Sequence, residues 1–157
     1  MTEEILRTDS SHPDFISLVV ELDKDLAGRY GDSQKFFNQF NKLDKIRHVV
    51  IVYRDGRPVG CGAMKKYDDT TMEIKRMFVS AEHRSQGIAG RIMDALETWA
   101  MELNLLSCIL ETAKKQPEAM HLYEKSGYFI IPNYDQYIGV EISVCMRKNL
   151  LQGCPKN

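Results

Sequence analysis

The sequence predicts an α/β domain, and two features of the chain carry this prediction. Residues 71–79 and 105–112 read as strands, and residues 87–103 between them show the 3.6-residue periodicity of a long amphipathic helix. A helical crossover of this kind joins two parallel strands of one sheet. Residues 48–53 and 59–67 flank a tight-turn signal and are expected to form an antiparallel hairpin.

The length and composition of the chain fit a single globular domain. It has 157 residues, which is a typical domain size, and 43% of them are hydrophobic, which is ordinary for a globular protein. We expect residues 1–148 to form the domain and residues 149–157 to form a short tail.

The N-terminal part of the chain predicts a strand followed by helices. Residues 3–8 read as a short strand, and Ser10 or Ser11 offers an N-cap before Pro13, which suits a first helical turn. The helix is expected to end near Gly28 or Gly31. Its apolar positions recur at helical spacing: Phe15, Leu18, Val19, Leu22 and Leu26. A second helical segment is expected to follow, with one apolar face: Phe36, Phe37, Phe40 and Leu43.

The hairpin and the strand after it carry two irregularities. Gly60 and Gly62 indicate a bulge or the close approach of another segment. In strand 71–79 the apolar alternation changes phase, and a slip at Lys75–Arg76 places Met72, Ile74, Met77 and Val79 on one face, whereas Phe78 fits the alternation without a slip. Such a slip is what a β-bulge produces, and bulges are frequent beside active sites.

The C-terminal half continues the alternation of strands and helices. Residues 105–112 are nearly apolar until Glu111, so this strand is expected to be buried on both faces. Pro117 begins another helix and Gly127 ends it in the C′ position. A short strand at 128–131, a loop at 132–139 and a last strand at 140–147 complete the predicted fold.

The charge balance and the absence of long apolar runs exclude several classes of protein. The formal net charge is −1, whereas nucleic-acid binders usually carry a strong basic excess. No apolar run approaches the roughly 20 residues that span a bilayer, and the N-terminus lacks the apolar segment of a signal peptide. We therefore expect a cytoplasmic protein without a nucleic-acid or membrane partner.

The cysteines and histidines predict neither disulfides nor a metal site. No Cys-x-x-Cys pair occurs, and Cys61, Cys108 and Cys145 lie in strand-like runs, where a reduced cysteine packs as a small hydrophobe. The four histidines lack the spacing of metal ligands, so no metal is expected.

The loop between strand 71–79 and helix 87–103 is suited to an anion. Small residues allow backbone amides to approach a ligand closely, and the unpaired amides at a helix start attract phosphate. Arg84 and Arg91 either add charge-assisted contacts or form an ordinary solvated helix start. The loop lacks the Gly-Lys-Ser/Thr of a nucleotide-binding P-loop and the Gly-x-Gly-x-x-Gly of a dinucleotide site.

Three segments together resemble the GNAT superfamily of N-acetyltransferases, of the small single-domain type found in bacteria. Arg84-x-x-Gly87-x-Ala89 matches the family signature Arg/Gln-x-x-Gly-x-Gly/Ala, with alanine at the last position. Residues 73–79 are similar to the family's fourth strand, and residues 118–128 to its fourth helix and the turn after it. The resemblance covers about residues 47–147.

The resemblance implies both a fold and a cofactor. It implies a mixed, mostly antiparallel sheet of about seven strands with about four flanking helices and a splayed central parallel pair. Acetyl-CoA is expected in that opening, with its pantetheine arm along Met77–Val79 and its pyrophosphate on the amides between Arg84 and Ala89. The implied cofactor-binding residues are Met77, Phe78, Val79, Arg84, Ser85, Gln86, Gly87, Ile88, Ala89, Gly90, Arg91 and Tyr123.

Acetyl transfer to an amine requires a base, an oxyanion donor and an acid for the leaving thiolate. The resemblance makes Tyr123 the acid, the alternative being a packed aromatic. It makes Glu73 the base through a water, the alternative being a surface carboxylate. Glu111 either orients an acceptor ammonium or ends its strand as a solvated carboxylate. The oxyanion donor is expected to be the backbone N–H of Met77 or Phe78.

The expected acceptor is a primary amine of a small molecule, which attacks acetyl-CoA directly in a ternary complex. The alternatives are a protein or peptide N-acetyltransferase and a non-catalytic sensor that binds acyl-CoA. The aromatic residues expected to line the acceptor pocket are Tyr30, Phe37, Tyr134 and Tyr137. The resemblance also makes a homodimer plausible, through the last strand and its loop.

Overall fold

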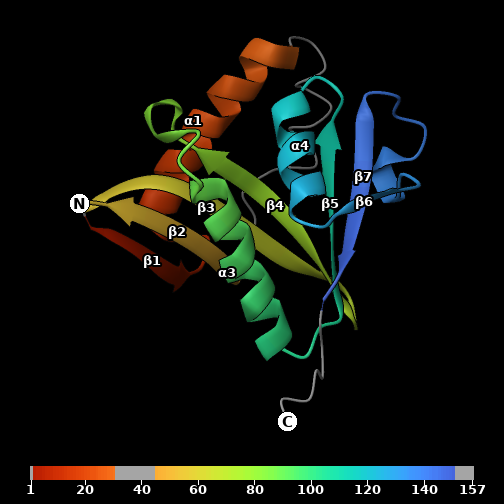
Figure 1. Cartoon of the computed structure of the whole chain (residues 1–157), viewed down its shortest axis with the longest axis horizontal. Coiled ribbons are helices and arrows are strands. Elements are labelled where there is room, and N and C mark those ends of the chain that lie inside the picture. The colour runs from red at the N-terminus through yellow and green to blue at the C-terminus, as the bar shows by residue number, and fades with distance from the viewer. Residues whose placement is uncertain (1, 31–44, 151–157) are drawn as a thin grey trace.

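The computed structural model describes residues 2–30 and 45–150 and shows one mixed sheet with helices on both faces (Figure 1). The seven strands follow the order β1-β2-β3-β4-β5-β7-β6. Their bounds are β1 Glu3–Thr8, β2 His48–Arg54, β3 Arg57–Asp68, β4 Thr71–Val79, β5 Ser107–Ala113, β6 Phe129–Ile131 and β7 Ser143–Asn149. The α-helices within the described residues are α1 Pro13–Tyr30, α3 Ile88–Glu102 and α4 Pro117–Lys125.

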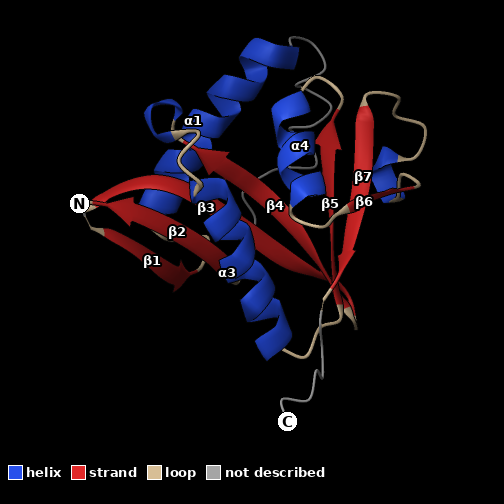
Figure 2. Cartoon of the chain, in the orientation of Figure 1, coloured by secondary structure: helices blue, strands red, loops and turns tan. Residues whose placement is uncertain are grey.

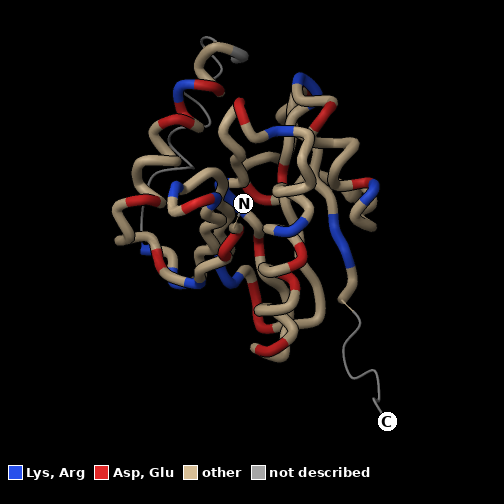
Figure 3. Tube along the Cα trace, turned by 60° about the vertical axis from the view of Figure 1, so that its left-hand side comes forward, with Lys and Arg blue, Asp and Glu red and all other residues tan. Residues whose placement is uncertain are grey.

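The predicted fold class is confirmed. All neighbouring strands are antiparallel except β4 and β5, which are parallel as the helical crossover predicts. The helix expected around Phe36–Leu43 lies outside the described residues. Positive and negative residues are intermixed along the chain rather than separated into two regions (Figure 3). None of the helices in the described ranges combines the length and the apolar composition that crossing a bilayer requires.

The central strands of the sheet are buried on both faces because helices cover each face (Figure 2). Along β2 the side chains alternate: Val50 and Val52 pack with α3, whereas Val49 and Ile51 pack with α1. All four side chains are fully buried. This two-sided burial explains why β2 reads as a continuous apolar run instead of an alternating one.

The predicted bulge in β4 is confirmed. In the register between β3 and β4, Cys61 pairs with Phe78 and Ala63 pairs with Lys75, so Arg76 and Met77 together oppose the single residue Gly62. Arg76 takes a left-handed backbone with φ 61°, which is uncommon for a residue other than glycine. The slip places four apolar residues of β4 in contact with one core cluster, on the α3 face: Met72, Ile74, Met77 and Val79. Phe78 packs in the cluster on the α1 face.

The parallel strands separate halfway along their length. They pair from Thr71 with Ser107 to Ile74 with Leu110, and beyond this point β4 and β5 continue without pairing to each other. The opening therefore lies at the C-terminal ends of the parallel pair, where α3 begins and α4 packs, which is where open sheets bind ligands.

The last strand of the C-terminal segment is shifted from expectation, since β7 spans Ser143–Asn149 where residues 140–147 were expected. The last strand begins at Ser143 instead of residue 140, because the preceding loop forms successive turns, with Val140 N–H bound to the Tyr137 carbonyl and Ser143 N–H to the Val140 carbonyl. The Asn133 amide nitrogen lies 3.1–3.2 Å from three carbonyl oxygens of this loop. As predicted, Gly127 occupies the C′ position of α4, with φ 100°.

The three cysteines in the described residues are buried and free, as expected. They lie in three different strands of the sheet: Cys61 in β3, Cys108 in β5 and Cys145 in β7.

Candidate active site

A cavity of about 500 Å³ occupies the opening between β4 and β5. Its walls come from β4, β5, α1, α4 and the loop before α3. Most of the residues expected to bind the cofactor or to catalyse line it: Glu73, Met77, Phe78, Val79, Arg84, Ser85, Gly87, Ile88, Ala89, Gly90 and Tyr123. The parallel pair thus brings the loop expected to bind an anion and the expected catalytic residues to one cavity.

The loop before α3 is shaped to present backbone amides. Ser85 and Gly87 take left-handed backbone conformations, with φ 64° and 80°, and Gly87 is the N-cap of α3. No side chain caps this helix start, and its first turn carries no acidic residue. The first amides of a helix have no intrahelical acceptor, so this end of the cavity favours an anion.

Arg84 lies in the wall of the same cavity. Its Nε donates to the Val79 carbonyl at 2.8 Å, and its guanidinium lies 5.6 Å from the centre of the Phe78 ring. Its terminal nitrogen is 3.7 Å from the Asp25 carboxylate of α1. These contacts hold the guanidinium against the end of β4 and α1 in the cavity wall.

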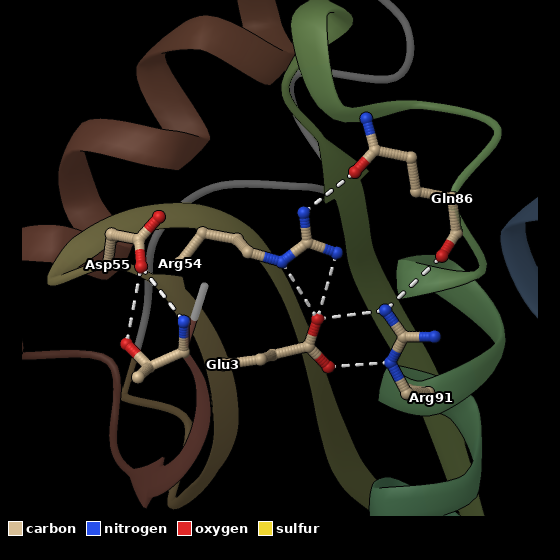
Figure 4. Close-up of polar contacts among 6 residues, drawn as sticks. Glu3, Arg54, Asp55, Gln86 and Arg91 are labelled. Atoms are coloured by element: carbon tan, nitrogen blue, oxygen red, sulfur yellow. Dashed lines mark hydrogen bonds and ion pairs between the residues drawn. The ribbon is translucent and has the colours of Figure 1, made fainter.

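Gln86 and Arg91 face a different part of the molecule. The Glu3 carboxylate accepts two hydrogen bonds from Arg91, at 2.6 and 2.8 Å, and one from Arg54 at 3.1 Å (Figure 4). The Gln86 side chain accepts from Arg54 at 2.7 Å, and the Gln86 carbonyl accepts from Arg91 at 3.2 Å. The hydrogen bond from Arg91 is the main cause of a lowered pKa at Glu3. These contacts tie the loop to β1 and β2.

Tyr123 lines the same cavity as this loop. It extends from α4 and is 7% exposed. Burial is the main cause of a raised pKa at its hydroxyl, and the negative charge of Glu111 adds to the effect. The phenol therefore stays protonated at neutral pH and is able to donate a proton.

Glu73 projects from the paired part of β4 and is held by two neighbours. Its carboxylate accepts a hydrogen bond from the Tyr134 hydroxyl at 2.9 Å and lies 3.9 Å from the Lys75 ammonium. The side chains of Glu73 and Lys75 are only 14% and 11% exposed. Glu73 is therefore an oriented carboxylate in a cavity wall.

Glu111 is another carboxylate that lines the cavity, which also has Asp25 and Glu118 in its wall. It accepts a hydrogen bond from the Ser143 hydroxyl at 2.8 Å. Burial raises the pKa of Glu111 to about 7, despite the opposing effects of Ser143 and Lys75. A group with this pKa exchanges protons readily at neutral pH.

The aromatic residues expected to line the acceptor pocket lie in different places. Tyr137 lines the cavity and is 2% exposed. Tyr134 orients Glu73 and its ring lies 5.7 Å from that of Tyr137. Phe37 lies outside the described residues, as does the side chain of Tyr30.

Several cavity residues were not identified from the sequence. Leu22, Asp25 and Leu26 of α1 form part of the wall, and His83 contributes a buried Nδ1 that has no hydrogen-bond partner in the described structure. Helical periodicity shows that α1 has an apolar face, but it does not show which part of the sheet that face covers. In the described ranges, no group of three or more His, Cys, Asp or Glu side chains is arranged to hold a metal ion.

Comparison with known proteins agrees with this arrangement. A model of the acetyltransferase (GNAT) family matches residues 7–128. The IAA acetyltransferase of Azospirillum brasilense is 31% identical over 138 residues, which cover 86% of this chain and 90% of that protein.

Two solved structures share the fold over nearly their whole length. A Klebsiella pneumoniae protein assigned as an acyl-CoA N-acyltransferase superposes with a TM-score of 0.80 at 24% identity, covering 96% of this chain and 99% of that one. A GNAT family acetyltransferase from Elizabethkingia anophelis with acetyl-CoA bound superposes with a TM-score of 0.68 at 16% identity, covering 94% and 98%. The family match spans most of the chain, and the chain therefore belongs to the GNAT family of acetyltransferases.

Proposed function

We propose that this protein transfers the acetyl group of acetyl-CoA to a primary amine of a small molecule, by direct attack in a ternary complex. One observation carries the proposal: a single cavity is lined by an amide-rich helix start, a buried tyrosine and the carboxylates of Glu73 and Glu111. The helix start suits the pyrophosphate of a cofactor, and the tyrosine and carboxylates supply the acid and base that acetyl transfer needs. The acetyl-CoA bound to the Elizabethkingia anophelis relative supports the same cofactor here.

The cofactor is expected to run along the opening. Its pyrophosphate would bind the amides between Arg84 and Ala89, with the Arg84 side chain beside them. Its pantetheine arm would lie along Met77–Val79, where β4 no longer pairs with β5 and its edge is available to an added extended chain. Ser85, Ile88 and Gly90 line the same cavity.

The roles of the catalytic residues follow from the protons that the reaction transfers and the oxyanion that it forms. An acceptor ammonium, with a pKa of about 10, has to lose a proton before it attacks. Glu73 would take this proton through a water, and a backbone N–H of Met77 or Phe78 would stabilise the oxyanion. Tyr123 would protonate the departing thiolate, whose pKa is about 8.5.

The acceptor end of the cavity supports a small substrate over a peptide. Tyr137 of the 132–142 loop and Leu26 of α1 pack in one apolar cluster, so the loop and the helix meet beside the cavity. A peptide substrate would need an open groove in this position.

The first test is thermal melting with acetyl-CoA, ATP or NAD. A ligand at 100 times its Kd stabilises the folded state by about 2.7 kcal/mol, which is roughly 5–10 °C for a domain of this size. We expect acetyl-CoA alone to raise Tm. Release of CoA thiol is then measured with small primary amines and, separately, with lysine peptides.

The possible outcomes separate the alternatives. Turnover with small amines supports the proposal, and turnover with peptides alone indicates a protein or peptide acetyltransferase. Acetyl-CoA binding without any turnover indicates a sensor. An unchanged Tm with acetyl-CoA would refute the proposed cofactor.

A further inference from the structure

A second cavity lies at the C-terminal end of α3, away from the candidate active site. Its volume is about 420 Å³, which is within the range of small-molecule sites. Its walls come from the start of β2, the later part of β3, the start of β4 and the segment that follows α3. The candidate active site includes the first residues of α3, and a helix of 15 residues is about 22 Å long. The two cavities are therefore separate.

Half of the lining of the second cavity is apolar. Four of these apolar side chains are at most 5% exposed and belong to the packed core, whereas Leu103 is 41% exposed. The apolar lining residues are Ile46, Met64, Met72, Leu103 and Leu105. An apolar ligand group that covers this surface removes it from water, which favours binding.

The other lining residues are all basic: Lys45, Arg47, His48, Lys65 and Lys66. No Asp or Glu of residues 2–30 and 45–150 lines this cavity, although the whole chain has 22 acidic residues and 21 Lys and Arg. The Lys66 ammonium lies 3.7 Å from the Asp69 carboxylate, but both side chains are exposed, and such a pair contributes little. The cavity thus concentrates positive charge that the chain as a whole does not carry.

Two observations agree with a positive potential in the second cavity. Burial is the main cause of a lowered pKa at His48, and the charge of Arg47 lowers this pKa further. At the end of α3, the carbonyls of residues 99–101 accept hydrogen bonds from the amides of residues 103–105, so these carbonyls are not left to attract a cation. An anion is therefore favoured in this cavity over a cation.

We propose that the second cavity binds a small organic anion, a carboxylate that carries an apolar body. The Arg47 guanidinium and the Lys66 ammonium bind the carboxylate through charge-assisted hydrogen bonds, and the apolar body covers Leu103 and its buried neighbours. Neither part suffices alone, since exposed ion pairs are weak and an apolar group gains nothing from the basic residues. This inference does not depend on the proposed acetyl transfer.

The fluorescence of Trp99 provides the test. Trp99 is the one tryptophan of the chain, and the centre of its ring lies 4.8 Å from that of the lining residue His48. Octanoate is titrated into the full chain, with octan-1-ol as the same body without the charge and acetate as the charge without the body. Calorimetry in parallel measures affinity and stoichiometry. We expect saturable 1:1 binding of octanoate with a change in fluorescence, and at least tenfold weaker binding of octan-1-ol and acetate.

Variants show whether the basic residues recognise the anion. An exposed ion pair changes affinity by up to about fivefold, so Arg47→Gln and Lys66→Gln together should weaken octanoate binding about tenfold. Both replace exposed side chains, so Tm should change little. The matched control is Arg57→Gln: Arg57 is an exposed arginine of the same hairpin that lines neither cavity, and its variant should bind octanoate as the wild type does.

Four results would overturn the inference. The first is no binding of octanoate by either method, and the second is octan-1-ol that binds as tightly as octanoate. The third is an unchanged affinity for octanoate in the double variant. The fourth is displacement of octanoate by acetyl-CoA, which would place it in the opening between β4 and β5. None of the four bears on acetyl transfer, which is measured separately by release of CoA thiol.

Discussion

Replacement of Gly62 by alanine tests how closely β3 packs against α3 and the bulge of β4. Gly62 lies opposite the bulge of β4, under α3. A Cβ atom at this position would lie 2.6 Å from Met77 Sδ, 2.7 Å from Ile92 Cγ2 and 3.0 Å from Leu96 Cδ1. Ordinary van der Waals contact begins at about 3.4 Å, so the neighbouring side chains have to move.

The cost follows from how little these neighbours can yield. Ile92 and Leu96 are fully buried, and forcing an extra methyl into a close-packed core costs about 1–3 kcal/mol. A Gly→Ala change restricts the unfolded chain and offsets roughly 0.5–1 kcal/mol of this. We expect a net loss of about 1–2 kcal/mol, which corresponds to a decrease in Tm of roughly 2–8 °C.

The measurement is urea unfolding together with thermal melting, with Gly28→Ala as the matched control. Gly28 lies within α1 and has no heavy atom within 4 Å of an added Cβ, so alanine there should stabilise the protein by about 0.5–1 kcal/mol. Wild-type or higher stability in Gly62→Ala would refute the close-packing argument. Equal losses in both variants would refute it as well.

Three further predictions concern the cavity. Tyr123→Phe should lower kcat by more than tenfold with little change in KM; an unaffected steady-state rate across pH would show that Tyr123 is only a packed aromatic. Glu3→Gln should weaken acetyl-CoA binding in a titration, because the two arginines that fix Gln86 lose their shared carboxylate. Glu102→Gln, which removes a paired carboxylate away from the loop, is its control and should bind as the wild type does. In the folded state Glu111 has a pKa of about 7 instead of 4.5, so its charged form is penalised there and stability should fall between pH 4.5 and 7 by about 3 kcal/mol. Glu111→Gln should remove this fall in urea unfolding at pH 5 and pH 8, and a persistent slope would contradict the assignment.

The elements of the fold could be predicted because their signals are local. The helical spacing from Phe15 to Leu26 and the glycine at position 127 each depend on a few neighbouring residues, and both predictions are confirmed. The bulge in β4 was predicted at Lys75–Arg76 and lies at Arg76–Met77. It could be predicted for the same reason, because a change of phase in the apolar pattern is what a bulge produces. The start of the last strand was misplaced by three residues, because the turns around Asn133 depend on contacts with carbonyls further along the loop.

The chain alone thus determined the fold class, the crossover that creates the opening, and the loop whose sequence identifies the family. Only the tertiary structure decided which side chains meet there. It paired Arg91 with Glu3, which is 88 positions away, Glu73 with Tyr134, and Glu111 with a serine of another strand. These partners are brought together by strand order and helix packing, which no local pattern records. Burial, which raises the pKa of Glu111 into the neutral range, is likewise a property of the packed molecule and not of the residue.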